Sequence, residues 1–371
     1  MKVSIIISSY NYGRFLAAAI DSALNQTYPD KEVIVVDDGS RDNSVEVMTS
    51  YGSRIQSLAK KNGGQGSAFN AGVKLSSGEV IVFLDSDDLL FPESIANMVP
   101  FFEDPEVVKV HWNLSVADEN GKMDATVVRP TLSEGDQREA VLRAGPDGYD
   151  WPPTSGNAWK RSFVDVAFPI PEKEFDTCPD IYLAALAPLY GQIRKIDEPQ
   201  GFWRHHPFNA SFIDQFGDNL RAGLRRAECY LQTIVQHAEK LGLTCDIAEM
   251  RTNSRWHQMD LAVTTMTSLI PEGDTLILAD QDHWKTSGQV FGRPALPFIE
   301  HEGQYWGCPA DDEQAIRELE RMRDLGARWI VFVWPYLWWL QHYAAFNDYL
   351  RTEYRLAKED ARIVIFDLRR S

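Results

Sequence analysis

The sequence is short of positive charge. Its 371 residues carry 54 acidic side chains against 37 lysines and arginines, which gives a formal net charge of −17. Such a surface repels a phosphate backbone, and no basic stretch interleaved with aromatic residues offsets the excess. The composition therefore argues against nucleic acid as a partner.

Cysteine is also scarce, and long apolar runs are missing. The four cysteines form no Cys-x-x-Cys pair, which disfavours a disulfide framework or a zinc site and predicts reduced thiols in a cytosolic protein. The longest apolar run, Trp329–Leu340, is shorter than the ~20 residues of a spanning helix. No transmembrane segment is predicted, and the apolar start of the chain is interpreted as a strand rather than a signal peptide.

The length fits two domains, and an apolar content of 44% is enough for a buried core. We expect an α/β domain over residues 1–212, a helical connector over 213–268 and a small α/β domain of unknown role over 269–371. The aromatic run at 334–339 is interpreted as core first, then as a partner surface or a peripheral contact with the inner face of a membrane. The sequence leaves open whether the chain forms a homo-oligomer.

Apolar runs alternate with helical segments in the first part of the chain. Strands are predicted at Val3–Ile7, Glu32–Val36, Ile55–Ala59 and Val80–Leu84. This βαβ pattern predicts strands that run parallel in one sheet. Residues 129–158 are rich in proline, glycine and aspartate and are expected to form a long loop over the site.

Acidic side chains follow two of these strands. Asp37 and Asp38 end the second strand, and Asp85, Asp87 and Asp88 end the strand that begins at Val80. In an open α/β sheet, ligands bind at the carboxyl ends of the strands. Crowded carboxylates need water, hydrogen-bond donors or a cation, and Mg²⁺ and Mn²⁺ prefer such oxygen ligands. The cluster predicts a metal site, with a solvated acidic turn as the alternative.

A glycine-rich phosphate loop is missing after the first strand, where the chain has Ser8, Ser9, Tyr10 and Asn11. This disfavours a nucleotidyltransferase, which also places carboxylates and a metal on an α/β sheet. A degenerate domain that only binds carbohydrate or serves as a scaffold is a further alternative. It would be marked by loss of the acidic residues, and these are present.

Five segments, in order, resemble family-2 glycosyltransferases over residues 1–210: SIIISSYN, VIVVDDGSRDNS, KNGGQGSAFNAG, SSGEVIVFLDSDD and FWRHHPFNAS. The resemblance implies a GT-A fold, a Rossmann-like nucleotide-binding domain with a mixed central sheet. It also implies an inverting enzyme that moves a sugar from a nucleotide-diphosphate sugar, with a UDP-sugar favoured, to a hydroxyl of a carbohydrate or glycolipid acceptor. Polysaccharide or glycoconjugate synthesis is the implied setting.

The resemblance also assigns donor contacts, with the Asp37 carboxylate accepting a hydrogen bond from the base, usually uracil N3–H. Asn62 and the glycines after it would let the backbone approach the nucleotide. The full set of implied donor contacts is Ser8, Tyr10, Asp37, Asp38, Asn62, Gly66, Asn70, Asp87 and Arg204.

For the metal, the resemblance implies Mn²⁺ or Mg²⁺ held against the diphosphate by Asp88, Asp87 and His206. A neutral imidazole and two carboxylates suit Mn²⁺. The alternative is a solvated histidine pair, in which His205 and His206 would have no ligand role.

An inverting displacement needs a general base for the acceptor proton. The family places an acid at the start of a helix after the long loop, and Asp180 fits that position best. The family often has Glu-Asp there, whereas this chain has Pro179-Asp180, so Asp176 remains a rival. The alternative is that Asp180 only caps its helix. Near the C-terminus, Asp280 with Asp282 and His283 is interpreted as a polar turn rather than a second site.

Overall fold

A computed structural model describes residues 1–206, 209, 216–284 and 288–369. The chain forms two compact units: Met1–Phe212 with Arg226–Asn253, and Ile213–Arg225 with Ser254–Ser371. The expected connector is therefore divided between the units, because the helix α8 (Phe216–Lys240) contributes to both. Part of the FWRHHPFNAS segment lies outside the described residues, but Arg204, His205 and His206 are described.

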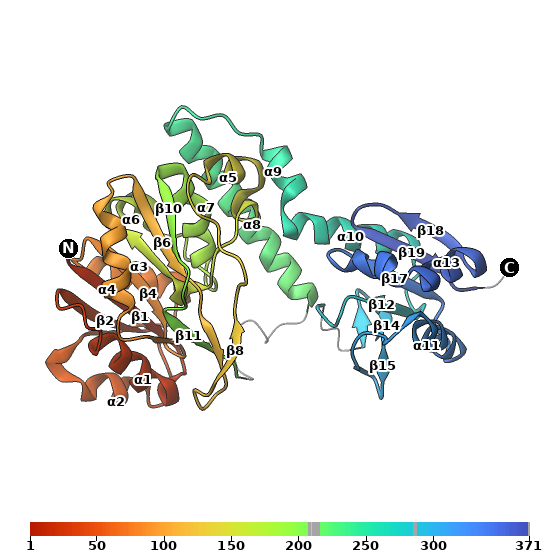
Figure 1. Cartoon of the computed structure of the whole chain (residues 1–371), viewed down its shortest axis with the longest axis horizontal. Coiled ribbons are helices and arrows are strands. Elements are labelled where there is room, and N and C mark those ends of the chain that lie inside the picture. Colours follow the sequence, from red (N-terminus) through yellow and green to blue (C-terminus); the bar gives the residue numbers. More distant parts are fainter. Residues whose placement is uncertain (207–208, 210–215, 285–287, 370–371) are drawn as a thin grey trace. The chain divides into compact units, whose positions relative to one another are not determined.

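A seven-stranded mixed sheet forms the centre of the first unit, in the order β10-β6-β9-β4-β1-β2-β3 (Figure 1). Strands β3, β2, β1 and β4 run parallel, as the βαβ pattern predicts. The strands are β1 Val3–Ser9, β2 Lys31–Asp37, β3 Gln56–Ala59, β4 Val80–Asp85, β6 Val107–Trp112, β9 Asn157–Lys160 and β10 Gln192–Ile196. All seven residues of β1 are buried, and one of its faces adds the apolar Val3, Ile5 and Ile7 to the core.

Short helices accompany this sheet. In α1 the buried residues recur at helical spacing (Phe15, Leu16, Ala19, Ile20, Ala23), so one apolar face packs on the core. The helices are α1 Gly13–Leu24, α2 Ser44–Ser50, α3 Gln65–Leu75, α4 Ser94–Met98, α5 Arg138–Ala144, α6 Arg161–Ala167, α7 Asp180–Tyr190 and α9 Ile247–Asn253. Single 3-10 turns are η1 Gly52–Arg54, η2 Val99–Glu103, η3 Gly145–Gly148 and η4 Thr154–Gly156.

The segment expected as one long loop is largely ordered. Residues 129–158 contain α5, η3 and η4 and the start of β9. Strand β9 enters the central sheet antiparallel to both neighbours, with Trp159 opposite Ile81 on β4 and Lys109 on β6. The loop prediction was wrong here because β9 has only four residues and follows a stretch rich in proline and glycine.

A smaller sheet, in the order β5-β11-β7-β8, brings distant segments to the end of β4. Its strands are β5 Leu89–Leu90, β7 Ser115–Ala117, β8 Met123–Val127 and β11 Gly201–Arg204. Strand β5 directly follows Asp88, and β11 pairs with it through Phe202 and Leu89. The pairing places Arg204 beside Asp87 and Asp88, in the segment Asp85–Asp88 that is called the acidic loop below.

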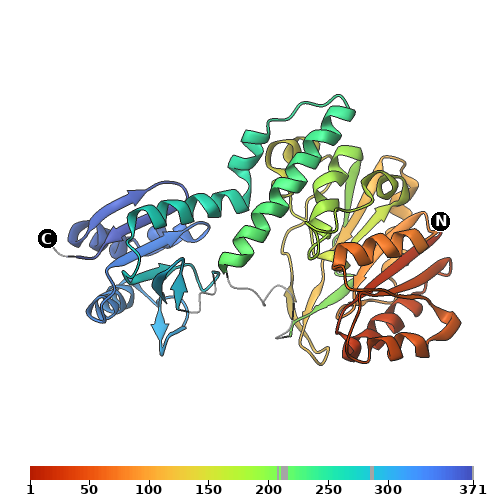
Figure 2. The ribbon, with the colours of Figure 1, turned by 180° about the vertical axis from the view of Figure 1, so that it is seen from behind.

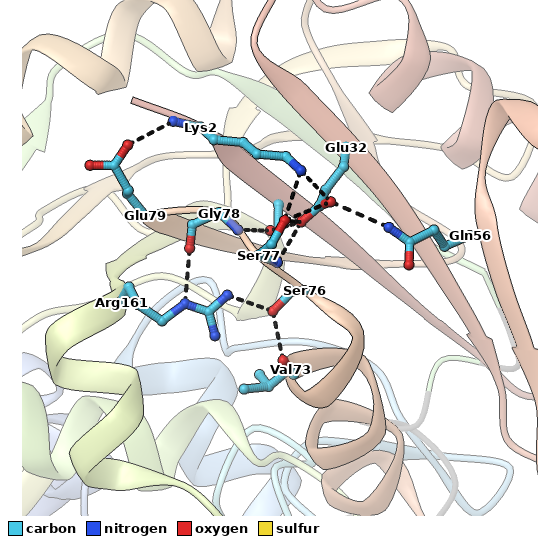
Figure 3. Close-up of polar contacts among 10 residues, drawn as sticks. Lys2, Glu32, Gln56, Val73, Ser76, Ser77, Gly78, Glu79 and Arg161 are labelled. Carbon is cyan, nitrogen blue, oxygen red and sulfur yellow. Dashed lines mark hydrogen bonds and ion pairs between the residues drawn. The ribbon is translucent and has the colours of Figure 1, made fainter.

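A polar network ties the amino ends of the strands together (Figure 3). Because β1, β2 and β4 are parallel, their carboxyl ends, including Asp85, lie at the opposite edge of the sheet. Glu32 of β2 accepts hydrogen bonds from Lys2 Nζ at 2.7 Å, Ser4 Oγ at 2.6 Å and Ser77 N at 2.6 Å. Burial alone would raise the pKa of Glu32, but these hydrogen bonds outweigh it and lower the pKa to about 2. Arg161 extends the network by donating to the Gly78 carbonyl at 2.9 Å.

Within the first unit, residues 226–240 of α8 and all of α9 lie beside α5 and α7 (Figures 1 and 2). The Tyr190 hydroxyl at the end of α7 hydrogen-bonds to His237 Nδ1 on α8 at 2.5 Å. Arg251 of α9 makes a bidentate pair with Glu228 of α8, at 2.7 and 2.8 Å. These contacts explain why this half of α8 belongs to the first unit.

The second unit has its own mixed sheet, in the order β13-β14-β12-β17-β19-β18. Its strands are β12 Leu276–Ala279, β13 Gln289–Val290, β14 Arg293–Pro297, β17 Trp329–Val333, β18 Arg355–Glu359 and β19 Ile363–Asp367, with a hairpin of β15 Glu300–His301 and β16 Gln304–Tyr305. Its helices are α10 Arg255–Leu269, α11 Asp312–Asp324, η6 Tyr336–Trp338, α12 Trp339–His342 and α13 Ala344–Glu353.

The aromatic run at 334–339 and the turn at Asp280 both lie in this unit. Trp339 is fully buried in the core, whereas Trp338 is partly exposed, so the core interpretation of the aromatic run holds for Trp339. The Asp280 carboxylate accepts hydrogen bonds from the backbone of Asp282 and Trp284, which is the pattern of a polar turn. In the parts of the chain that the structure describes, no helix has both the length and the apolar character to cross a bilayer.

Candidate active site

The loop after β4 concentrates buried negative charge. Asp85 ends the strand, and Asp87 and Asp88 are only 8% and 1% exposed. Burial, reinforced by the charges of Asp88 and Asp87, raises the pKa of Asp85 well above its usual range. Burial and Asp87 do the same to the pKa of Asp88. The cluster therefore holds more negative charge than its own contacts neutralise, and a bound cation would stabilise it.

Asp88 is held in one orientation by two donors. Its Oδ2 accepts a hydrogen bond from Ser155 Oγ of η4 at 2.6 Å, and its Oδ1 accepts one from the backbone N–H of Arg204 at 3.0 Å. A carboxylate has about four lone-pair positions, so each oxygen keeps capacity for another ligand. The fold thus fixes the orientation of the Asp88 carboxylate and leaves lone pairs on both oxygens for a metal ion.

The structure brings two of the three predicted metal residues, Asp87 and His206, into direct contact. His206 Nε2 lies 3.1 Å from Asp87 Oδ2, and Asn209 Nδ2 donates to the same oxygen at 3.2 Å. The His206 ring packs against Phe15 and Tyr12 at centroid distances of 4.9 and 5.3 Å. Asn209, which sequence reasoning missed, also accepts from the His206 backbone N–H through its Oδ1 at 2.6 Å, so it orients both residues.

The donor set fits a hard cation that is shared with a ligand. No group of three or more His, Cys, Asp or Glu side chains among the described residues is arranged to hold a metal by itself. Mg²⁺ is usually bound through one or two carboxylates, with waters and substrate phosphates as the other ligands. Asp87 and Asp88 fit that pattern, whereas direct coordination by His206 stays a prediction.

Arg204 is largely used inside the protein. Its Nε donates to the Asp87 carbonyl and its Nη1 to the Glu119 carbonyl, both at 2.8 Å, and its guanidinium lies 4.7 Å from the centre of the Phe15 ring. These contacts hold the Asp87–Asp88 loop in position. The predicted contact with phosphate stays a prediction, and the structure adds this supporting role.

The end of β2 offers an unused acceptor. Asp37 Oδ2 accepts from the backbone N–H groups of Gly39 and Ser40 at 3.1 and 3.0 Å, whereas its Oδ1 is buried without a partner among the described residues. A buried acceptor without a donor is unfavourable, and a base N–H would relieve it. Ser8 lies between Val36 and Asp85 in the sheet register.

The Asp38 carboxylate is hydrogen-bonded to the neighbouring loop, residues 60–64. It accepts from Lys60 Nζ at 2.5 Å and from the backbone N–H groups of Gly63 at 3.0 Å and Gly64 at 2.7 Å. Asn62, in the same loop, is exposed. The structure therefore gives Asp38 a positioning role, and through it sets where Asn62 lies.

The remaining predicted donor residues differ in placement. Tyr10 is 44% exposed at the end of β1. The Asn70 amide is used by another segment: its Oδ1 accepts from Ile170 N at 2.8 Å and its Nδ2 donates to Ile170 O and Glu172 Oε1. These contacts tie α3 to residues 170–172 and engage both ends of the Asn70 amide there.

Gly66 and its neighbours let α3 approach a second segment closely. The Gly66 N–H donates to the Phe175 carbonyl at 3.0 Å, and a Cβ on Gly66 would lie 2.4 Å from that oxygen. Gln65, which sequence reasoning missed, donates through Nε2 to Asp85 Oδ1 at 2.7 Å and accepts from Cys178 N at 3.2 Å. Its position between glycines in NGGQG was the available signal.

Asp180 faces the same acidic cluster. It is the first residue of α7, 9% exposed, and burial raises its pKa. The Thr154 side chain lowers the pKa of both Asp180 and Asp85, whereas the charge of Asp180 adds to burial in raising the pKa of Asp85. Asp180 Oδ1 also accepts from Ile181 N at 3.0 Å, so it contributes to its helix start as well. The rival Asp176 is exposed.

Comparisons with known proteins agree on one class, the glycosyltransferases. Residues 4–143 match the model of glycosyl transferase family 2. An uncharacterized glycosyltransferase of Nostoc sp. is 34% identical over 274 residues, which are 69% of this chain and 84% of that protein. One from Rickettsia typhi is 47% identical over 97 residues, 26% of this chain and 30% of that protein. The chain belongs to glycosyl transferase family 2.

Solved structures support the fold. The crystal structure of S. aureus TarS 1-349 in complex with UDP has a TM-score of 0.51 and 17% identity, covering 98% of this chain and 96% of that one. The complex of the same protein with UDP-GlcNAc has a TM-score of 0.50, covering 71% and 72%. The predicted GT-A fold is thereby confirmed.

Proposed function

We propose that this glycosyltransferase is metal-dependent and inverting, and that it transfers a sugar from a nucleotide-diphosphate sugar to a hydroxyl of a carbohydrate or glycolipid acceptor. One observation carries the proposal. Asp85, Asp87 and Asp88 lie together at the end of β4, and the charge of Asp180, from a distant part of the chain, adds to burial in raising the pKa of Asp85. An acid suited to proton transfer thus lies beside acids suited to a metal and a diphosphate. Polysaccharide or glycoconjugate synthesis is the setting that we propose.

Donor recognition is assigned to the end of β2. Asp37 Oδ1, which has no partner in the part of the chain that the structure describes, is a strong acceptor for a base N–H such as uracil N3–H, which makes a UDP-sugar the first donor to test. The backbone bonds to Gly39 and Ser40 keep the other oxygen fixed, so the carboxylate keeps its orientation.

Diphosphate binding is assigned to Asp87 and Asp88, which would hold Mn²⁺ or Mg²⁺. When bound, such an ion neutralises the charge that develops on the departing diphosphate. The protein's own contribution is orientation: Ser155 and the Arg204 backbone aim Asp88, and His206 with Asn209 aims Asp87.

Proton transfer is assigned to Asp180. Its carboxylate would take the proton from the acceptor hydroxyl as that oxygen attacks the sugar carbon opposite the leaving diphosphate, so that one displacement inverts the configuration. Burial raises the pKa of Asp180, which strengthens it as a base while it remains ionised.

The test compares Asp180→Asn with Asp176→Asn, a matched change in the same segment at an exposed position. Asp180→Asn should lower transfer by ~10²–10⁴-fold while donor affinity, measured by calorimetry, stays unchanged. Asp176→Asn should keep near-normal transfer. The opposite pattern, with transfer lost only in Asp176→Asn, would remove Asp180 from the base role.

A further inference from the structure

Gln65, the first residue of α3, joins two segments that lie far apart in the chain. Its Nε2 donates to Asp85 Oδ1 at 2.7 Å, and its Oε1 accepts from the backbone N–H of Cys178 at 3.2 Å. Asp85 begins the acidic loop, and Cys178 lies two residues before Asp180, the proposed base. One amide side chain therefore connects the proposed metal–diphosphate site to the segment that carries the base.

The backbone at the start of α3 is bound to the same segment. The Gln65 N–H donates to the Asp176 carbonyl at 2.7 Å, and the Gly66 N–H donates to the Phe175 carbonyl at 3.0 Å. A Cβ on Gly66 would lie 2.4 Å from that carbonyl oxygen, so the two backbones are in direct contact. Because its backbone is held in this way, the Gln65 side chain links the position of Asp85 to that of residues 175–178.

Cys178 depends on its contacts for its conformation. It adopts φ +53°, a region that residues other than glycine rarely adopt and that persists only where the surrounding structure holds it. Gln65 Oε1 is one of the groups that hold it, because it accepts the Cys178 N–H. The Cys178 carbonyl accepts from Ile181 N at 3.4 Å, within the turn that begins α7. The place of Asp180, the first residue of α7, therefore depends on this turn.

The chemistry of the amide also suits the acidic loop. Asp38, at the end of β2, accepts from the ammonium group of Lys60 at 2.5 Å, so its charge is compensated within the protein. Asp85 instead accepts from the neutral amide of Gln65, which orients the carboxylate without supplying a countercharge. The negative charge of the acidic loop therefore stays available to a bound cation.

We propose that Gln65 is a positioning residue for the transfer reaction: its amide sets the separation between the acidic loop and the segment that carries Asp180. The inference rests on the proposed function, in which the acidic loop holds the metal and the diphosphate and Asp180 is the base. Without the amide, both parts still form, but they shift relative to each other. A misplacement of about 1 Å can lower a rate ~10²-fold, so the shift lowers kcat rather than donor binding.

The first test needs no substrate. Backbone hydrogen exchange of the full-length chain is compared for the wild type, Gln65→Met and Gln56→Met. Gln56 is the matched control, because its Nε2 also donates to a carboxylate, that of Glu32, at 3.3 Å. In Gln65→Met, exchange in the peptide that covers residues 176–182 should rise by roughly 3- to 10-fold, the value of one lost hydrogen bond. Gln56→Met should leave this peptide as in the wild type. Unchanged exchange in Gln65→Met would overturn the inference.

The second test separates turnover from donor binding. UDP release from UDP-glucose, UDP-galactose and UDP-GlcNAc is followed with Mn²⁺ present, and binding of UDP with Mn²⁺ is measured by calorimetry. In Gln65→Met, kcat should fall by ~10- to 10²-fold. The UDP affinity should change by less than about threefold, because Gln65 is not among the assigned donor contacts. A loss of UDP affinity with unchanged kcat would overturn the inference.

Gln65→Glu tests the need for a neutral donor. The carboxylate keeps the length of the side chain and an oxygen for the Cys178 N–H, but it places a second negative charge against Asp85. Its kcat should fall at least as far as that of Gln65→Met. A kcat equal to that of the wild type would show that Asp85 does not need the amide donor, and would overturn the inference.

The tests distinguish this inference from the proposed function. Full turnover by Asp180→Asn would overturn the base assignment, and with it the catalytic part of the inference. Unchanged hydrogen exchange in Gln65→Met would overturn the positioning role of Gln65 alone, while the assignment of Asp180 as base would stand.

Discussion

At the scale of single residues, the site depends on small side chains that connect its acids. Ser155 Oγ donates to Asp88 Oδ2 at 2.6 Å and accepts from the backbone N–H of Asp85 at 3.1 Å. The neighbouring Thr154 lowers the pKa of both Asp85 and Asp180, against the effect of burial. Ser155 of η4 thus holds the end of β4 and the loop after it in one arrangement, at the cost of crowding their charges.

That crowding predicts opposite effects of Asp88→Asn on function and on stability. The pKa of Asp88 is raised in the folded chain, so its stabilising contribution is lost as pH rises above the unfolded value. Near pH 7 the metal-free variant should therefore be more stable than the wild type, by about 1 kcal/mol, while turnover is lost. Thermal melts and a transfer assay check this. A less stable but active variant would contradict it.

Glu32 gives the reverse pH dependence at the other end of the sheet. Its pKa is lowered to about 2, so it stabilises the fold above the unfolded value of 4.5 and loses that contribution as pH falls toward 2. Glu32→Gln should lower the unfolding free energy by roughly 1–2 kcal/mol at pH 7, and the difference should shrink in acid. Glu103→Gln, at an exposed position, is the control. A difference from wild type that is constant with pH would rule out this role.

At the scale of elements, the start of α3 is where the site is assembled. Gly64 adopts φ +87°, and a Cβ there would lie 2.5 Å from Asp176 Cα. The close approach places Gln65 between Asp85 and Cys178. Helix α3 thereby fixes the distance between the acidic loop and the segment that leads to Asp180.

Gly64→Ala tests this close approach, and Gly135→Ala is its matched control. Both glycines have φ +87°, but nothing lies within 4 Å of a Cβ on Gly135. Both variants bear the strain of a positive φ, of order 1 kcal/mol. Only Gly64→Ala should lose further stability and lower turnover, as measured by urea unfolding and a transfer assay. Equal losses in the two variants would show that the contact with Asp176 has no effect.

The sequence predicted the parallel strands and their acidic ends because each is a local pattern: an apolar run followed by aspartate. It also predicted that Asp180 begins a helix. It missed Gln65 and Asn209, whose roles depend on partners far along the chain. The use of the Asn70 amide by residues 170–172 could not be predicted for the same reason. Strand β9 was missed because its neighbours in the sheet, rather than its own four residues, determine its conformation.

At the scale of the whole molecule, the two units share one helix but have separate cores. One large core cluster of the first unit contains residues between Val3 and Ile196, whereas two clusters of the second unit contain residues from Leu220 onward. Residues Arg226–Asn253 belong to the first unit. A chain ending after Asn253 keeps every element of the candidate site.

Truncation after Asn253 should therefore leave a folded protein that keeps metal-dependent donor binding. Circular dichroism, a cooperative melt and calorimetry with the donor nucleotide check this. Truncation after residue 212 is the control. It removes α8 and α9, including the Tyr190–His237 contact, and should lower the melting temperature further. Aggregation of the longer fragment would show that the first unit needs the second in order to fold.

The most direct test of the central claim is a set of thermal melts of the full-length chain with UDP, GDP, dTDP and CMP, each with and without Mn²⁺. Ligand binding to the native state raises the melting temperature by mass action. We predict a clear rise with UDP that needs Mn²⁺ and disappears in Asp88→Asn. No rise with any nucleotide, or a rise that is the same without Mn²⁺, would contradict the assignment of the acidic loop as a metal–diphosphate site.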